Sequence, residues 1–89
     1  MTTKTKCFKL AKKHNLEIYL IPKEYRFGDA QYYDINLPEG YQLDEFDDRT
    51  GLSSGGWVIY SNFKEKLWED IHKDLLEVIS YKPWFRVEN

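Results

Sequence analysis

Residues 62–80, NFKEKLWEDIHKDLLEVIS, decide the fold, because they carry the clearest helical pattern in this 89-residue chain. Apolar residues recur there every three or four positions, which places them on one side of an α-helix. They are Phe63, Leu67, Trp68, Ile71, Leu75, Val78 and Ile79. Asn62 and Glu65 have the spacing of a capping box, and Pro83 prevents the helix from continuing far beyond Ser80. The stretch therefore predicts an amphipathic helix packed on a core.

A second helical pattern covers residues 4–14, with Thr3 as the predicted N-terminal cap. At 100° per residue, one side of this helix is mainly apolar and consists of Cys7, Phe8, Leu10, Ala11 and His14. The other side carries Lys6, Lys9, Lys12 and Lys13. Asn15 is predicted to end the helix in a left-handed conformation. This helix is expected to have one packed face and one basic face.

Three strands are predicted between the helices, over residues 16–22, 30–37 and 57–60. Alternation in the first strand separates Leu16, Ile18 and Leu20 from Glu17, Tyr19 and Ile21. In the second strand it separates Tyr33, Ile35 and Leu37 from Tyr32, Asp34 and Asn36. The register of the third strand stays open. Its contribution to the outer face is either Val58 with Tyr60 or Trp57 with Ile59.

These elements predict an α+β fold in α-β-β-β-α order, formed by a single small domain over residues 1–89. Short links favour a three-stranded antiparallel meander, and two apolar helix faces favour packing of both helices on one side of it. Residues 38–55 show no sustained periodicity, although Tyr41, Leu43, Phe46 and Leu52 indicate partial packing. The tail, residues 81–89, is expected to pack back through Trp84 and Phe85.

Composition limits the class of protein. The chain is 42% hydrophobic and 17% aromatic, which is too rich in core-forming residues for an intrinsically disordered protein. The longest apolar run, residues 18–21, is far too short to cross a bilayer, and no signal-peptide core follows the basic start. Cys7 is the only cysteine, so no internal disulfide can form. We therefore expect a cytoplasmic protein with no membrane association.

The net charge of −2 conceals a segregation of charge along the chain. Residues 1–16 hold five lysines and no acid, whereas residues 29–48 hold seven acids and no base. Four of these acids form the run Asp44, Glu45, Asp47 and Asp48. Such a run is most often a solvated loop, but it would also attract a basic partner surface.

No constellation of catalytic or metal-ligating residues emerges from the sequence. Nucleophile and base candidates are limited to Cys7, Ser53, Ser54, His14 and His72, without the partners that would activate them. Two histidines and one cysteine do not give a zinc pattern, and the acidic run lacks the glycine and closing glutamate of an EF-hand. The glycines of residues 51–56 precede a strand and lack the Lys-Ser/Thr ending of a phosphate-binding loop. We expect no enzymatic activity, cofactor, metal or small-molecule substrate.

Aromatic residues on the outer sheet face are the main candidate binding residues. A protein partner, or a second copy of the chain, is expected to contact Tyr19, Tyr32, Asp34, Tyr60, Asp44, Glu45, Asp47 and Asp48. An equally weighted interpretation is simple cross-strand packing of half-exposed tyrosines. Single-stranded nucleic acid is disfavoured on this face, because Glu17 and Asp34 would repel its phosphates.

The sequence thus leads to two function hypotheses. The first is a non-enzymatic protein-interaction or regulatory module, with homodimerisation as one form. The alternative is a nucleic-acid-binding domain that uses the lysine face of the first helix, formed by Lys6, Lys9, Lys12 and Lys13.

Overall fold

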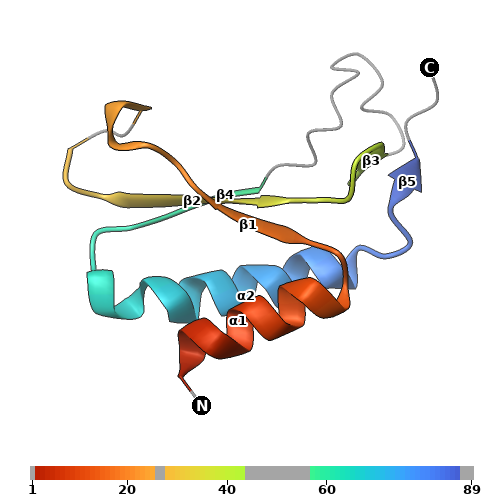
Figure 1. Cartoon of the computed structure of the whole chain (residues 1–89), viewed down its shortest axis with the longest axis horizontal. Helices are drawn as coiled ribbons and strands as arrows, with labels where there is room; N and C mark the ends of the chain where they lie inside the picture. Colours follow the sequence, from red (N-terminus) through yellow and green to blue (C-terminus); the bar gives the residue numbers. More distant parts are fainter. Residues whose placement is uncertain (1, 26–27, 44–56, 87–89) are drawn as a thin grey trace.

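The computed structural model describes residues 2–25, 28–43 and 57–86, which form a layer of two helices against a layer of strands (Figure 1). The helices are α1 (Thr3–Lys13) and α2 (Leu67–Ser80), and the short 3-10 turns are η1 (Lys23–Tyr25) and η2 (Lys64–Lys66). The main sheet consists of β1 (Glu17–Leu20), β2 (Gln31–Asn36) and β4 (Trp57–Ser61). A second, two-stranded sheet consists of β3 (Tyr41–Gln42) and β5 (Phe85–Arg86).

The main sheet is antiparallel, with strand order β1-β2-β4, and both helices lie on the same side of it (Figure 1). The register pairs Ile18 with Ile35 and Tyr33 with Ile59. These are the strand residues that face the helices, because side chains alternate between the two faces of a sheet. The predicted α+β fold, with its antiparallel meander and one helical face, is confirmed.

The core lies between the sheet and the helices, where the two apolar periodicities meet. Its buried members are Cys7, Ala11, Leu16, Ile35, Leu37, Ile59, Leu67, Ile71, Leu75 and Val78. Removing a large aliphatic side chain of this kind from water contributes about 1.5–3 kcal/mol to folding. The helical spacing of residues 67–78 therefore explains why α2 supplies four of these side chains.

The ends of α1 follow the predicted pattern, with a shift of one residue at the start. Thr2 rather than Thr3 is the N-terminal cap, and its hydroxyl accepts a hydrogen bond from the Thr5 backbone N–H at 3.2 Å. The prediction of Thr3 as the cap is wrong because the helix begins one residue earlier than the pattern suggests. Asn15 has a φ of 59°, which confirms the predicted left-handed stop.

The start of α2 differs more from its prediction. The Ser61 hydroxyl donates to the Phe63 carbonyl oxygen at 2.9 Å and accepts from the Phe63 N–H at 3.1 Å. The chain then passes through η2, and α2 begins only at Leu67. The predicted capping box of Asn62 and Glu65 is therefore wrong, since β4 continues through Ser61 and this serine forms the turn. Phe63 is exposed and does not belong to the buried stripe.

Part of the segment predicted as an irregular loop is a strand. Tyr41 pairs with Arg86 and Gln42 with Phe85, which joins this segment to the C-terminal tail. Tyr41 and Leu43 pack on the core as predicted, while Phe46 and Leu52 lie outside the described residues. Strands of two residues are too short to show alternation, so the sequence did not reveal β3 or β5.

Trp84 packs back on the core as predicted, whereas Phe85 is exposed and residues 87–89 lie outside the described residues. The Trp84 ring contacts the core, and its indole N–H donates to the Val78 carbonyl oxygen at 3.1 Å. The same carbonyl oxygen also accepts from the Tyr81 N–H at 3.2 Å, so the indole adds a second donor at the end of the helix. The tail therefore closes the C-terminal end of α2.

Candidate interaction surface

The side of the main sheet that faces away from the helices is called here the open sheet face. One row across it contains Tyr19, Asp34 and Val58, and the neighbouring row contains Tyr32 and Tyr60. The open question of register is thus settled in favour of Val58 and Tyr60. Tyr19 on β1 is 46% exposed, and Val58 and Tyr60 on β4 are 56% and 62% exposed, so large apolar groups meet solvent on both outer strands of the sheet.

Two of these rings support each other. Tyr32 and Tyr60 face each other across β2 and β4, with ring centroids 5.8 Å apart and an interplanar angle of 27°. Such an aromatic pair contributes about 0.5–1.5 kcal/mol beyond the area that it buries. Cross-strand packing therefore accounts for part of this aromatic surface, whereas Tyr19 and Val58 stay exposed on its other row.

The structure brings four of the predicted partner-binding residues together on one face. Tyr19, Tyr32 and Tyr60 surround Asp34, which is half-buried in the central strand. The other four, Asp44, Glu45, Asp47 and Asp48, lie outside the described residues. Their predicted role as an acidic contact stays a prediction.

The lysine face predicted for the first helix is present on α1. Lys6, Lys9, Lys12 and Lys13 are all exposed. Lys4, on the same helix, places its ammonium group 5.5 Å from the centre of the Trp68 ring, a cation–π distance. These lysines belong to the helical layer, so the two predicted binding surfaces lie on different layers of the molecule.

The single thiol is held in the core. Cys7 is fully buried, and its Sγ donates to the Trp68 carbonyl oxygen at 3.3 Å. Burial raises the pKa of this thiol above its usual value, because the thiolate would lose solvation. Since the thiolate is the nucleophile, Cys7 has the properties of a structural residue.

His14 contacts a cation instead of a carboxylate. Its Nδ1 lies 2.9 Å from the Nζ of Lys82, which donates to it as an ammonium group. Loss of solvation, followed by the charges of Lys82 and Lys13, lowers the pKa of His14. The imidazole is therefore neutral near pH 7 and acts as a hydrogen-bond acceptor at the end of α1. His72 is half-buried on α2, which agrees with its predicted position at the border of the apolar stripe.

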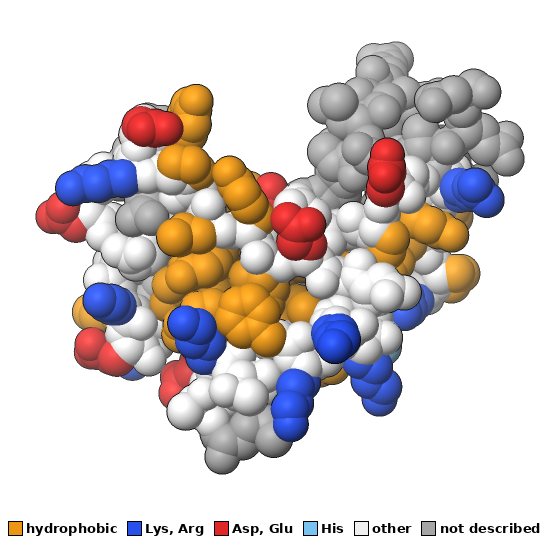
Figure 2. All heavy atoms as spheres, viewed as in Figure 1, with side chains coloured by type: hydrophobic (Ala, Val, Ile, Leu, Met, Phe, Trp, Pro, Cys, Tyr) orange, Lys and Arg blue, Asp and Glu red, His pale blue; other side chains and the backbone are white. Residues whose placement is uncertain are grey.

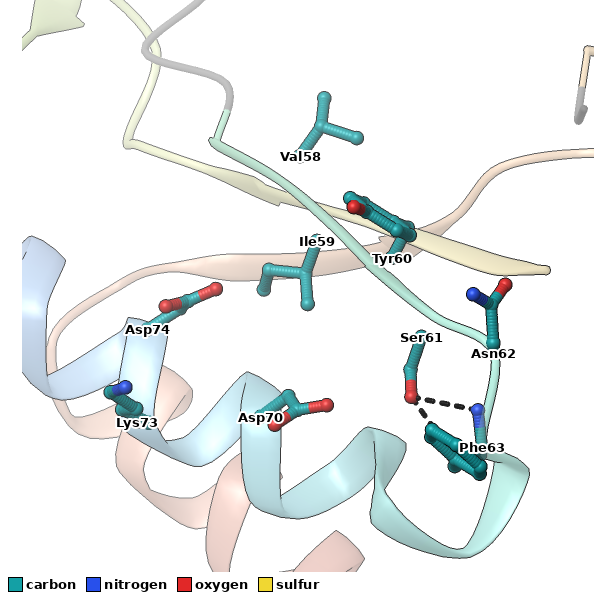
Figure 3. Close-up of a pocket in the computed structure, with 9 residues that line it drawn as sticks. All are labelled: Val58, Ile59, Tyr60, Ser61, Asn62, Phe63, Asp70, Lys73 and Asp74. Atoms are coloured by element: carbon teal, nitrogen blue, oxygen red, sulfur yellow. Dashed lines mark hydrogen bonds between the residues drawn. The ribbon is translucent and has the colours of Figure 1, made fainter.

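An open groove of about 430 Å³ runs between the outer edge of β4 and α2 (Figure 3). Residues 58–63 form one wall, and Asp70, Lys73 and Asp74 come from the helix below. The Ser61 hydroxyl in this lining is already bonded to the backbone of Phe63. The groove is lined by two carboxylates and one ammonium group, and its serine hydroxyl is occupied by the backbone.

Sequence reasoning missed this groove. Asp70 and Asp74 have the spacing of neighbours on a helix, but nothing in the pattern placed β4 above them. Within the three described ranges, no three His, Cys, Asp or Glu residues are grouped so that they could hold a metal ion.

Comparison of the chain with protein-family models, with curated proteins and with solved structures gives no match. In the part of the chain that the structure describes, neither helix combines the length and apolarity needed to span a bilayer. The fold and its surface define a small two-layer α+β domain with an exposed aromatic sheet face. The function is therefore argued from the geometry of that face.

Proposed function

We propose that this protein is a non-enzymatic interaction module that binds another protein through the open sheet face. The exposure of Tyr19 on β1 and of Val58 and Tyr60 on β4, the two outer strands of the sheet, is the observation that carries this proposal. Aromatic side chains are enriched at protein interfaces, where they bury a large area with few rotatable bonds. The stacked Tyr32 ring holds Tyr60 in place before a partner arrives.

The charges on this face favour a protein over a nucleic acid. Asp34 lies between Tyr19 and Val58, and Glu17 is exposed at the end of the same face. Carboxylates among the rings repel phosphates, whereas a protein can present a hydrogen-bond donor or a cation to them. The preferred partner therefore carries an apolar patch with basic or donor groups at its centre.

Photo-crosslinking in cells of the natural host tests the proposal. The photoreactive residue benzoylphenylalanine is placed at Tyr60, on the open sheet face, and as a matched control at Glu69, which is exposed on α2. We expect a discrete crosslinked product from position 60 and none from position 69. Equal products from positions 60 and 69 would contradict the proposal. Absence of a product both from position 60 and from position 19, which lies on the same face, would also contradict it.

A second candidate function is nucleic-acid binding through α1. All four lysines of the predicted face are exposed, and this helix contains no acidic residue. An electrophoretic mobility assay with mixed DNA and RNA at low salt is the direct test, since lysine-driven affinity is strongest there. The test variant changes Lys6, Lys9, Lys12 and Lys13 to Gln, and the charge-matched control changes Lys23, Lys64, Lys66 and Lys73. Absence of a shift with the unaltered protein would exclude this function.

A further inference from the structure

The core is open along one edge of the molecule, between β1 and α1. Sequence periodicity assigns Leu20 and Phe8 to the packed faces of their elements, yet each is 45% exposed. Figure 2 shows hydrophobic side chains gathered between the sheet and α1, with Lys and Arg side chains around them. Apolar residues that follow the core pattern and still meet water mark a surface that another molecule can cover.

The surface at this edge is hollowed. A groove of about 560 Å³, called here the β1 groove, lies between Phe8, Ala11 and Lys12 of α1 and Leu16 and Ile18 at β1. Aromatic contacts stiffen one end of it, because the ring centroids of Phe8 and Tyr33 lie 5.4 Å and 5.1 Å from that of Trp68. The apolar wall is therefore formed before any ligand binds.

The strand that borders this groove has an open hydrogen-bonding edge. The Ile21 N–H donates to the Tyr32 carbonyl oxygen at 3.0 Å, which shows that Ile21 and its alternate neighbours direct their backbone groups toward β2. The backbone groups of Ile18 and Leu20 therefore point outward. Among the described residues no strand lies on that side of β1, which is an outer strand of the sheet.

The widths of the two layers leave space for one more strand. Two packed helices cover about 20 Å, because each is about 10 Å wide with its side chains. Strands lie about 4.8 Å apart, so such a pair of helices covers about four strands. The main sheet has three strands in the described part of the chain. A fourth strand beside β1 would lie over the exposed side of α1 and cover Phe8.

The charge next to the groove is positive. Lys12 lines the groove, and α1 carries four further lysines and no acid. Glu17 also borders the groove, but alternation along β1 places its side chain on the same face as Tyr19, away from α1. Lysine side chains from the helix are long enough to reach the outer edge of an added strand.

We propose that the β1 groove binds an extended, acidic segment of a partner protein as a fourth strand of the sheet. Its apolar side chains, at alternate positions, cover Phe8, Ile18 and Leu20. Its backbone completes the outward hydrogen bonds of Ile18 and Leu20. Acidic residues at its two ends, on the same side of the strand as its apolar residues, lie within reach of the α1 lysines. Strand addition of this kind takes affinity from the backbone bonds and specificity from the side-chain pockets. The β1 groove is separate from the open sheet face. A negative result for strand addition at the groove therefore leaves the proposal of partner binding at the open sheet face unaffected, and the reverse also holds.

Fluorescence anisotropy of labelled synthetic heptapeptides with the full chain tests the inference. The probe has the sequence ETVTVTE, with acetylated and amidated ends, so that both Glu residues and both Val residues lie on one side of the strand. One control, KTVTVTK, reverses the charge, and the other, ETVPVTE, interrupts strand pairing with proline. We expect ETVTVTE to bind at least tenfold more tightly than either control. Equal affinity for the proline control, or absence of binding, would overturn the proposal.

Protein variants and amide exchange locate the binding site. Leu20→Ser and Lys12→Glu are each expected to weaken binding of ETVTVTE at least tenfold. Leu76→Ser, which removes an exposed apolar residue from α2, is expected to leave this binding unchanged. Bound peptide is expected to slow hydrogen exchange at the Ile18 and Leu20 amides at least tenfold. Unchanged exchange at these amides, or their protection by self-association of the chain without peptide, would refute the assignment.

Discussion

At the scale of single residues, His14 and Cys7 have surroundings that suppress their usual chemistry. Burial keeps the Cys7 thiol protonated by raising its pKa. A neighbouring ammonium group and loss of solvation keep His14 neutral by lowering its pKa. Both environments favour a structural role for these residues.

The lowered pKa of His14 predicts a small pH dependence of stability. The folded protein binds this proton less tightly than the unfolded chain, where the pKa is about 6.5. The contribution of His14 to the free energy of unfolding is therefore fully present above pH 6.5. It is lost as the pH falls from 6.5 toward the pKa of His14 in the folded protein. We expect an NMR titration of the imidazole to give a pKa below 6.5. Lys82→Met is expected to move this pKa only part of the way back, since desolvation is the larger cause.

The control for this titration is Lys73→Met, which removes an exposed ammonium group from α2. This change is expected to leave the pKa of His14 where it was. An unchanged pKa in Lys82→Met would show that the contact between Nζ and Nδ1 does not persist in solution.

At the scale of secondary-structure elements, the turn between β4 and α2 shows how a local signal was misread. The sequence places Asn62 in a capping position, but the structure assigns the turn to Ser61, which is buried and bonded twice to Phe63. The spacing of Asn62 and Glu65 is short-range information. The length of β4 depends instead on its pairing with β2, where Ser61 lies opposite Gln31.

Two alanine variants separate these interpretations. Ser61→Ala is expected to lower the free energy of unfolding by about 1–2 kcal/mol, because it removes a buried hydroxyl that satisfies backbone groups. Asn62→Ala is expected to change it by less than about 0.5 kcal/mol, since this residue is exposed. Urea denaturation followed by circular dichroism measures both values. A larger loss in Asn62→Ala would restore the capping-box interpretation.

At the scale of the whole molecule, residues 2–25, 28–43 and 57–86 include two apolar surfaces that remain exposed after the core has formed. One is the open sheet face, and the other is the β1 groove. They lie on different sides of β1, so occupation of one leaves the other accessible. A small domain with two such surfaces can join two partners.

The homodimer form of the proposed function predicts that the apparent mass rises with protein concentration. The same face of two copies would then be covered, as in an isologous dimer. Multi-angle light scattering measures this mass, and the double variant Tyr19→Ser with Tyr60→Ser is expected to stay monomeric. Leu76→Ser, which removes an exposed apolar residue from α2, is the matched control and is expected to associate normally. If the native chain is strictly monomeric, the homodimer form of the proposed function is excluded, and the partner is a different protein.

The sequence by itself determined the two helices, the three main strands and most of the core. These features follow from local periodicity: a spacing of three or four residues in α2, and alternation through Ile35 in β2, are visible without knowledge of any distant residue. The same alternation placed Tyr19, Tyr32 and Asp34 on one face. Most of the proposed protein-binding surface could therefore be predicted.

The tertiary structure alone decided how these elements meet. Strand pairing chose Val58 and Tyr60 for the open sheet face and joined Tyr41 to Arg86, because register is set by contacts between residues far apart in the chain. The tertiary structure also leaves Phe8 and Leu20 exposed, although their spacing in the sequence is that of core residues. The physical reason is the mismatch in width between two helices and three strands, which no local pattern in the sequence encodes.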